Sequence, residues 1–302
     1  MADLLVTGTL ALDNVRTPFG QVTDALGGSA TFFAYAASFF TKVKLVAVVG
    51  HDFPKEHLDL LADRGVDLGG VQVTDGPTFR WAGEYGYDLN EARTLDTRLG
   101  VLADFKPALP AHYRRCPFVF LANLDPLIQL DVLRSMERPR LAALDTMNFW
   151  IKGNPAGLRE VLREVDALLV NDTEARMLAG EPNLVKAARM ILAWGPRVVV
   201  VKRGEYGALM VTPDRFFFVP AYPLESVFDP TGAGDTFAGG FMGVLAGEEA
   251  TDEAALRRAI VYGSVIASFT VEDFSLDRLK RLTRSEVDAR YRAFREMMQV
   301  EL

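Results

Sequence analysis

Short apolar runs, many of them β-branched, recur along the chain at about the length of one strand. They are apolar at successive positions, which is typical of strands buried on both faces of a parallel sheet. The runs are Leu4–Thr7, Val43–Val49, Phe118–Leu121, Leu141–Leu144, Ala167–Val170 and Val198–Val201. Helix-like segments lie between them at Ser29–Phe40, Phe53–Arg64, Asp125–Met136, Ala156–Val165, Asn183–Ala193 and Asp252–Thr270. This alternation predicts an α/β fold, a mostly parallel sheet with helices on both faces.

One stretch breaks this alternation of strands and helices. Aromatic residues alternate there with polar or small ones, at Phe79, Trp81, Tyr85 and Tyr87. Period two predicts a strand with one aromatic and one polar face, paired antiparallel with Thr94–Leu99. Together with a strand in Asp13–Val22, it is expected to form a small sheet outside the main core, a lid. The alternative is a hairpin at the edge of the main sheet.

The domain organisation follows from length and from the absence of dividing features. At about 150 residues per domain, 302 residues allow two domains or one large domain with an attachment. We find no repeat, low-complexity segment or linker, so residues 1–302 are expected to form one domain. The lid strands, near residues 13–22 and 79–99, are inserted in it. Ser285–Gln299 carries apolar residues at helical spacing in a charged background, which predicts a surface helix.

Composition and charge narrow the functional classes. Hydrophobic residues make up 49% of the chain and charged residues 24%, which allows a sizeable core and excludes wholesale disorder. The 33 Lys and Arg against 40 Asp and Glu give a net charge of −7 without a basic run. Nucleic acids and anionic membranes need clustered cations, so neither is an expected partner.

Cysteine and histidine usage argues against a metal centre made by those residues. Cys116 is the single cysteine, which excludes cysteine clusters and an intrachain disulfide and suits a reducing compartment. Two of the three histidines, His51 and His57, lack the spacing of a helical zinc pair. Residues 1–8 do not resemble a signal peptide, and apolar runs are too short to span a bilayer. A cytoplasmic location is therefore expected.

The strongest chemical motif is Asp229-Pro-Thr-Gly-Ala-Gly-Asp-Thr-Phe-Ala-Gly-Gly240, which leads into an apolar helix. Its residues 231–234 can aim several backbone N–H groups at one point, where the helix dipole adds positive potential. Such a site suits the charge on a transferring phosphoryl group, and Asp235 can accept the proton of a substrate hydroxyl. Alternatively, Asp235 only complements the helix dipole. The two further glycines of the motif favour a role of Asp235 in phosphoryl transfer.

Other phosphate and nucleophile motifs are missing from the sequence. We find no Walker-type Gly-x-x-x-x-Gly-Lys-Ser/Thr string, no dinucleotide Gly-x-Gly-x-x-Gly fingerprint and no Gly-x-Ser-x-Gly elbow. A P-loop NTPase, a nicotinamide dehydrogenase and an α/β-hydrolase are thus disfavoured.

Asp229–Gly240 resembles the C-terminal signature of the ribokinase-like (PfkB) family of small-molecule kinases. Other segments resemble motifs of that family in the same order: Gly27-Gly28, Gly50–Phe53, Asn171–Glu174 and Lys202–Gly207. The resemblance covers the chain from about Leu5 to Leu279. It implies a Rossmann-like α/β domain with a small β lid. It also implies transfer of the γ-phosphoryl group of ATP to a substrate hydroxyl, with Mg²⁺.

The resemblance also implies roles for individual residues on the phosphate side. Asp235 would be the catalytic base, and an anion hole would be formed by Gly232, Ala233 and Gly234. Asn171 and Glu174 would organise Mg²⁺ and phosphate mainly through water, without a protein cluster that binds the metal directly. The nucleotide would be contacted by Lys202, Gly204 and Thr231, and Asp229 is a candidate ligand of K⁺. By themselves, Glu174 and Asp229 fit a helix-start charge and a plain turn equally well. A lysine that follows a valine strand, as Lys202 does, is by itself usually a solvated strand end.

On the substrate side, Asp13 resembles the acidic residue of the family's first strand, which accepts hydrogen bonds from substrate hydroxyls. The glycine pair Gly27 and Gly28 belongs to the same side. Asp145 and Asn148 resemble an Asp-x-Asn element that approaches substrate or phosphate. The alternatives are a turn aspartate for Asp13 and a capping turn for the Asp145–Asn148 segment.

Phe32 departs from the family pattern, because sugar kinases of this family carry Asn five residues after the first glycine of the pair. A polar contact to a sugar hydroxyl is lost, and such a loss can shift specificity by orders of magnitude. The aromatic lid face can stack on a nucleobase, shield the site, or pack against the domain or a second subunit. We expect a sugar substrate, with a nucleoside or an inositol-type polyol as alternatives. A non-catalytic relative and a homodimer through the lid also stay open.

Overall fold

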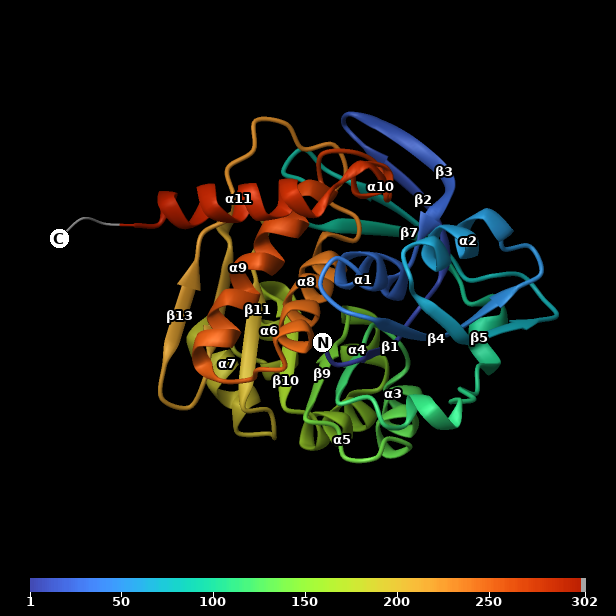
Figure 1. Cartoon of the computed structure of the whole chain (residues 1–302), viewed down its shortest axis with the longest axis horizontal. Coiled ribbons are helices and arrows are strands. Elements are labelled where there is room, and N and C mark those ends of the chain that lie inside the picture. Colours follow the sequence, from blue (N-terminus) through green and yellow to red (C-terminus); the bar gives the residue numbers. More distant parts are fainter. Residues whose placement is uncertain (300–302) are drawn as a thin grey trace.

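The main sheet has nine strands in the order β13-β12-β11-β10-β9-β8-β1-β4-β5. Figure 1 shows it in the computed structural model, which describes residues 1–299, so positions 300–302 of the expected domain lie outside the described residues. Its strands are β1 (Leu4–Thr7), β4 (Val43–Gly50), β5 (Asp67–Thr74), β8 (Phe118–Leu121), β9 (Leu141–Asp145), β10 (Ala167–Asn171), β11 (Val198–Lys202), β12 (Ala208–Val211) and β13 (Phe216–Val219). Every pair is parallel except β11–β12 and β12–β13, which confirms the mostly parallel sheet.

Helices cover both faces of this sheet, as the alternation predicts. Successive residues of a strand point to opposite faces and therefore belong to two separate hydrophobic cores. Leu4 and Val6 belong to one core and Leu5 to the other. The first core packs against α1 (Ser29–Ala37), α2 (Lys55–Asp63), α8 (Ala233–Glu248), α9 (Glu253–Thr270), α10 (Asp277–Arg281) and α11 (Arg284–Met297). The second packs against α3 (Pro126–Arg134), α4 (Asn148–Gly153), α5 (Pro155–Glu164), α6 (Asp172–Ala179) and α7 (Leu184–Leu192). Helix α11 confirms the expected C-terminal surface helix, which buries Val287 and Phe294.

The lid is a separate four-stranded sheet in the order β3-β2-β6-β7. Its strands are β2 (Ala11–Thr17), β3 (Gly20–Gly27), β6 (Arg80–Tyr85) and β7 (Ala92–Arg98). The antiparallel pairing of β6 with β7 is confirmed. The single strand expected over Asp13–Val22 is wrong, because the chain reverses there from β2 into β3. Pro18 has no N–H for a ladder, and the Thr17 hydroxyl accepts a bond from the Phe19 amide at 3.1 Å, closing the turn.

Two signature glycines serve helix packing. A Cβ on Gly239 would lie 2.4 Å from the Phe33 carbonyl oxygen of α1. A Cβ on Gly240 would lie 2.6 Å from the Ile266 side chain of α9. These glycines let α8 approach both helices closely, and the close packing holds the beginning of α8 at the carboxyl ends of the parallel strands. Ligands of open α/β sheets bind at that edge.

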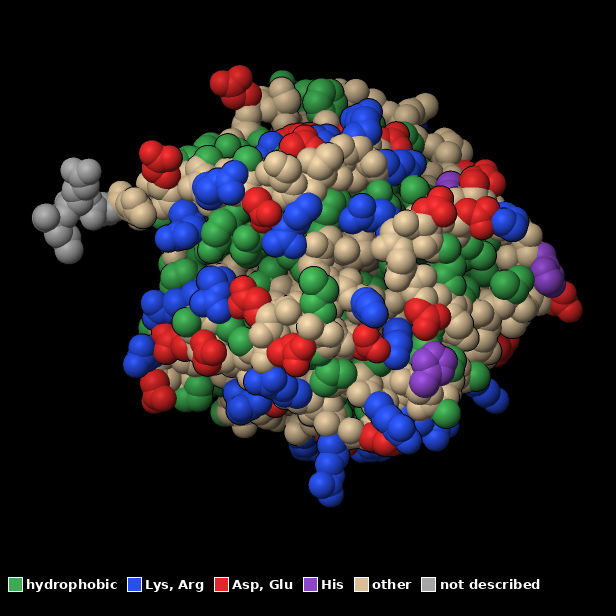
Figure 2. Space-filling view, viewed as in Figure 1, with side chains coloured by type: hydrophobic (Ala, Val, Ile, Leu, Met, Phe, Trp, Pro, Cys, Tyr) green, Lys and Arg blue, Asp and Glu red, His purple; other side chains and the backbone are tan. Residues whose placement is uncertain are grey.

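Charged side chains of both signs, Lys and Arg as well as Asp and Glu, are mixed on the face of the molecule seen in Figure 2. Among the described residues, no helix has the length and apolar character that crossing a membrane requires. Short 3-10 helices occur at η1 (Gly100–Asp104), η2 (Ala111–Tyr113) and η3 (Gly204–Tyr206).

Candidate active site

Asp235 lies in the first turn of α8, at the edge where the lid meets the main sheet. Burial, together with the nearby Asp145 carboxylate, raises the pKa of its carboxyl to about 7, and Lys202 opposes the increase. The Ala233 amide donates to the Pro230 carbonyl at 3.1 Å. Within the described chain, the amides of Gly232, Gly234 and Asp235 have no such partner, as expected in a first helical turn. The expected anion hole is therefore available from Gly232 and Gly234, whereas the Ala233 amide is occupied.

Lys202 at the end of β11 is held beside this turn. Its Nζ lies 2.9 Å from Oδ2 of Asp145, with 15% and 6% of the two side chains exposed. A Cβ on Gly234 would lie 3.0 Å from the same Nζ, so the ammonium group borders the first turn of α8. Burial opposes its charge, but the surrounding carboxylates, Asp145 foremost, leave the pKa of Lys202 raised. The structure thus places Asp145 against Lys202, beside the first turn of α8.

Asn171 and Glu174 have a structural role as well as a place near the site. The Asn171 side chain accepts from the Glu174 amide at 2.7 Å, and the Glu174 carboxylate accepts from the Asn171 amide at 2.9 Å. This reciprocal pair is a capping box at the start of α6. Burial, together with the Asp145 and Asp235 carboxylates, raises the pKa of Glu174 to about 8, against the opposing effect of Lys202. Glu174 therefore faces the same charged cluster as Lys202.

Asp13 from the lid forms the other side of the site. Its carboxylate accepts a bond from the Gly28 amide, and burial together with Asp229 and Asp235 raises its pKa to about 7. Within the described residues, its Oδ1 has no hydrogen-bond partner. A Cβ on Gly27 would lie 1.9 Å from Asp13, so only glycine fits there. A buried carboxylate oxygen without a partner is suited to accept a bond from a ligand hydroxyl.

Tyr85 and Asp229 connect the lid with the loop before α8. The Thr231 hydroxyl donates to the Tyr85 hydroxyl at 3.4 Å, and Tyr85 lies near enough to feel the charges of Asp13 and Asp235. Burial raises the pKa of Tyr85, so its hydroxyl stays protonated. Asp229 accepts bonds from the Thr231 amide at 2.9 Å and the Ser275 amide at 3.3 Å. Burial also raises the pKa of Asp229.

Phe32 lies directly against the anion-hole loop. It is 1% exposed on α1, and a Cβ on Gly232 would lie 2.4 Å from its ring. Gly232 also has a φ of +74°, a left-handed conformation that favours glycine. The position where sugar kinases of the resembled family carry Asn thus supports the loop with an apolar ring and offers no polar contact.

A cavity of about 480 Å³ extends from Lys202 and Gly234 along α8. Gly204 and Pro230 also line it, and its apolar lining includes Tyr222, Leu224, Phe237, Ala267 and Val271. A volume of this size suits a small-molecule ligand, for which roughly 300–1,000 Å³ is usual. Its phosphate-side end and largely apolar wall are compatible with a nucleotide.

Some site residues were predicted and others were not. Asn148 lies exposed at the first position of α4, so the structure gives it no buried role. Tyr85 was placed on the aromatic lid face but not on the site, because the alternation of residues does not tell which face turns inward. Tyr222 comes from a connection without a recognisable pattern, whereas Phe237 was present in the signature string.

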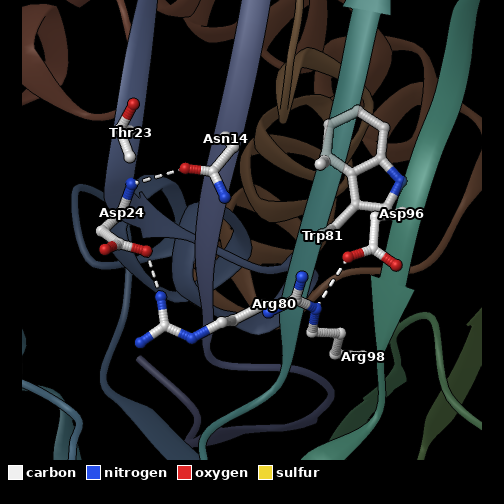
Figure 3. Close-up of a pocket in the computed structure, with 8 residues that line it drawn as sticks. Asn14, Thr23, Asp24, Arg80, Trp81, Asp96 and Arg98 are labelled. Carbon is white, nitrogen blue, oxygen red and sulfur yellow. Dashed lines mark hydrogen bonds and ion pairs between the residues drawn. The ribbon is translucent and has the colours of Figure 1, made fainter.

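A second hollow, of about 330 Å³, lies on the lid (Figure 3). Its charged residues are paired among themselves: Arg80 with Asp24, and Arg98 with Asp96 at 2.7 Å. Arg80 also reaches Asp52, at 3.1 Å, and so ties the lid to the turn after β4. Because its charges are satisfied within the protein, this hollow adds no chemistry to the site.

Comparison with known proteins gives the family. Residues 6–278 match the pfkB family of carbohydrate kinases. A cytidine kinase of Thermococcus kodakarensis is 33% identical over 248 residues, which cover 80% of this chain and 88% of that protein. A ribokinase of Staphylococcus aureus is 31% identical over 128 residues, 39% of this chain and 40% of that protein.

The fold agrees with this match. A crystal structure of a ribokinase from Cryptococcus neoformans, in complex with ADP, superimposes with a TM-score of 0.80 at 22% identity. The superposition covers 96% of this chain and all of that one, at 100%. The α/β sheet, the separate lid and the signature at the start of α8 are thus found together. The chain belongs to the pfkB family of carbohydrate kinases and is a small-molecule kinase.

Proposed function

We propose that this kinase transfers the γ-phosphoryl group of ATP to a hydroxyl group of a nucleoside. One observation carries the proposal: Asp235 lies between an acceptor side, with Asp13, and a donor side, with Lys202. A single carboxylate can therefore receive a proton from the acceptor while the phosphoryl group approaches from the donor side. With a pKa raised to about 7, it is suited to take up that proton near neutral pH.

In the proposed reaction, the acceptor hydroxyl oxygen forms a bond to the γ-phosphorus as the bond to the β–γ bridging oxygen breaks. The hydroxyl proton moves to Asp235, and ADP leaves with the bridging oxygen. The free amides of Gly232 and Gly234 donate hydrogen bonds to the phosphoryl oxygens, and Lys202 supplies positive charge beside them. Lid closure excludes water, which would otherwise compete as acceptor.

The charge balance of the site supports a divalent cation with ATP. Three carboxylates, Asp145, Glu174 and Asp235, share one ammonium group, Lys202. Burial first, and then the charge of Asp145, raise the pKa values of Glu174 and Asp235. Within the described chain, no group of three or more His, Cys, Asp or Glu side chains could hold a metal ion alone. In this proposal Mg²⁺ would be held by ATP oxygens and water, with Glu174 nearby, and would neutralise phosphate charge.

We also propose that Asp229 helps to bind K⁺, on the basis of the family resemblance. Both carboxylate oxygens of Asp229 already accept backbone bonds, from Thr231 and Ser275, so the side chain braces the loop. Comparing kcat with and without potassium, at constant ionic strength, tests this role.

Two observations favour a nucleoside over a free sugar as acceptor. Phe32 replaces the polar residue that contacts a sugar hydroxyl in the resembled sugar kinases, and Tyr85 brings an aromatic ring to the acceptor side. The match to the cytidine kinase covers 80% of this chain, whereas the match to the ribokinase covers 39%. Ribose is the second candidate, because the family match and the ribokinase relative point to sugars. A polyol such as inositol is a third.

The test is ADP release from Mg-ATP with nucleosides, ribose and inositol as acceptors, using Asp235→Asn and Asp214→Asn. The first removes the base; the second changes an exposed carboxylate between β12 and β13. We expect turnover with a nucleoside, about 10²–10⁴-fold lower in Asp235→Asn and unchanged in Asp214→Asn. Turnover with ribose alone would refute the acceptor class. Wild-type kcat in Asp235→Asn would refute the base.

Location and assembly complete the proposal. Cys116 is a buried free thiol, which supports a cytoplasmic location. A homodimer through the lid would use the exposed edge strand β7, since the aromatic residue Tyr85 on β6 turns toward the site. Light scattering of wild type against Leu95→Lys, a change on β7, tests the dimer.

A further inference from the structure

We propose that the turn between β6 and β7, residues 86–91, is part of the donor site, so that the lid encloses ATP as well as the acceptor. This inference rests on the proposed function for the identity of the donor. The lid strands alone would cover only the acceptor side, where Asp13 and Tyr85 lie. The turn extends the lid beyond that side, to the cavity that begins at Lys202.

The lid turn contributes directly to the wall of the donor cavity. Asp88, Leu89 and Asn90 line the same 480 Å³ cavity as Lys202 and Gly234. The rest of its lining comes from α8, α9, the η3 turn and the connection before α8. Residues of the lid therefore face a ligand in this cavity together with residues more than 100 positions later in the chain.

Two side-chain contacts hold the lid turn across the donor cavity. Asn90 Nδ2 donates to Glu205 Oε1 at 3.4 Å, on the η3 turn. A Cβ on Gly204 would lie 2.4 Å from Asn90 Oδ1, so Asn90 lies directly over that glycine. On the other flank, the Thr173 hydroxyl donates to Glu91 Oε1 at 2.6 Å, in the first turn of α6. The turn is thus fixed to two elements that both border the phosphate side.

A consequence for binding follows from the continuity of strand β6 with the lid turn, residues 86–91. Tyr85, the last residue of β6, contacts the loop before α8, and the lid turn begins at the next residue. An acceptor that holds β6 in this position therefore also stabilises the position in which Asn90 contacts Glu205 and Glu91 contacts Thr173. By linkage, an acceptor that closes the lid must raise the affinity for ATP, and ATP must raise the affinity for the acceptor by the same factor. For a net gain equal to one hydrogen bond of ordinary strength, that factor is roughly 3- to 10-fold.

The test compares Asn90→Ala/Glu91→Ala with Tyr87→Ala. Tyr87 lies in the same turn with 92% of its surface exposed, so its truncation controls for changes to the loop itself. In the double variant we expect KM for ATP to rise roughly 3- to 10-fold, with kcat changed by less. In Asp235→Asn, ATP binding measured by calorimetry should tighten when the acceptor is added, and this tightening should vanish in Asp235→Asn/Asn90→Ala/Glu91→Ala.

The outcomes separate this inference from the proposed function. If the wild-type protein binds ATP without turnover on any acceptor, the proposed function fails, but direct binding to the lid-turn variants still decides the inference. If the double variant binds ATP as wild type does, or changes only KM for the acceptor, the turn is not part of the donor site. Absence of ATP binding in the wild type would overturn the inference as well. Asn90→Gln, which keeps the amide, should recover part of the affinity.

Discussion

Gly232→Ala is the substitution that tests the construction of the anion hole most sharply. Alanine at a φ of +74° costs about 1–2 kcal/mol, because its Cβ crowds the backbone in the left-handed region. The same Cβ would lie 2.4 Å from the Phe32 ring, a contact that must relax within a packed core at about 1–3 kcal/mol. The two contributions together predict a loss of about 2–5 kcal/mol in the free energy of unfolding.

Gly180→Ala separates these two contributions. Gly180 ends α6 with a φ of +64°, yet a Cβ there would meet nothing within 4 Å. It should therefore lose only the backbone contribution of about 1–2 kcal/mol. Urea unfolding of both variants gives the two free energies, and their difference measures the contact with Phe32. If the loop yields instead of the core, its amides move, and a displacement of about 1 Å can lower kcat by about 100-fold.

The reasoning is refuted by a Gly232→Ala protein with wild-type stability and wild-type kcat. It is also refuted if Gly232→Ala and Gly180→Ala are destabilised equally and both keep their activity, because the Phe32 ring would then be irrelevant. In Phe32→Ala/Gly232→Ala, the ring is absent, so the two changes should be less destabilising together than the sum of the single variants.

Two predictions concern pH. Since Asp235 must be deprotonated to act as a base and its pKa is about 7, kcat/KM should rise tenfold per pH unit below about 7 and level off above it; a flat profile between about pH 5.5 and 8 contradicts this. The pKa of Asp13 is about 7 in the folded protein, whereas its ordinary value is 3.8. Between these two pH values the folded state binds more protons than the unfolded state, so the free energy of unfolding falls as the pH rises. Asp13→Asn should therefore gain stability relative to wild type between pH 5 and 8, by at most about 4 kcal/mol; the same scan of Asp214→Asn should parallel wild type.

The strands in the middle of the sheet were predictable because they are buried on both faces. Val198–Val201 and Phe118–Leu121 are continuous apolar runs, and each lies within an observed strand. The edge strands β5 and β13 were not predicted, because they are partly exposed. Strand β5 is half-exposed and contains two glycines, and β13 exposes Phe216 and Phe218. Edge strands are held by their neighbours' hydrogen bonds, which leave little trace in the hydrophobic pattern.

The site was predictable where it is local in sequence and not where it depends on tertiary contacts. The signature string contains Asp235 and its amides within a few residues, so their proximity follows from one helix start. Asn90 reaches Glu205 across 115 positions, and that contact depends on the register of the lid strands. The role of Phe32 was also hidden, because its ring meets Gly232 only when α1 and α8 pack together.

The order of the site along the chain has a consequence for how such kinases diversify. The acceptor side comes from Asp13, Gly27, Gly28 and Tyr85, all within the first third of the sequence, whereas Lys202, Tyr222 and Phe237 of the donor cavity come from the last half. A recombination point between β8 and β9 would exchange one set and retain the other. Chimeras made there could inherit a new acceptor from one parent and the phosphoryl donor from the other. The lid turn would have to suit both halves, as would the contact between Phe32 and Gly232.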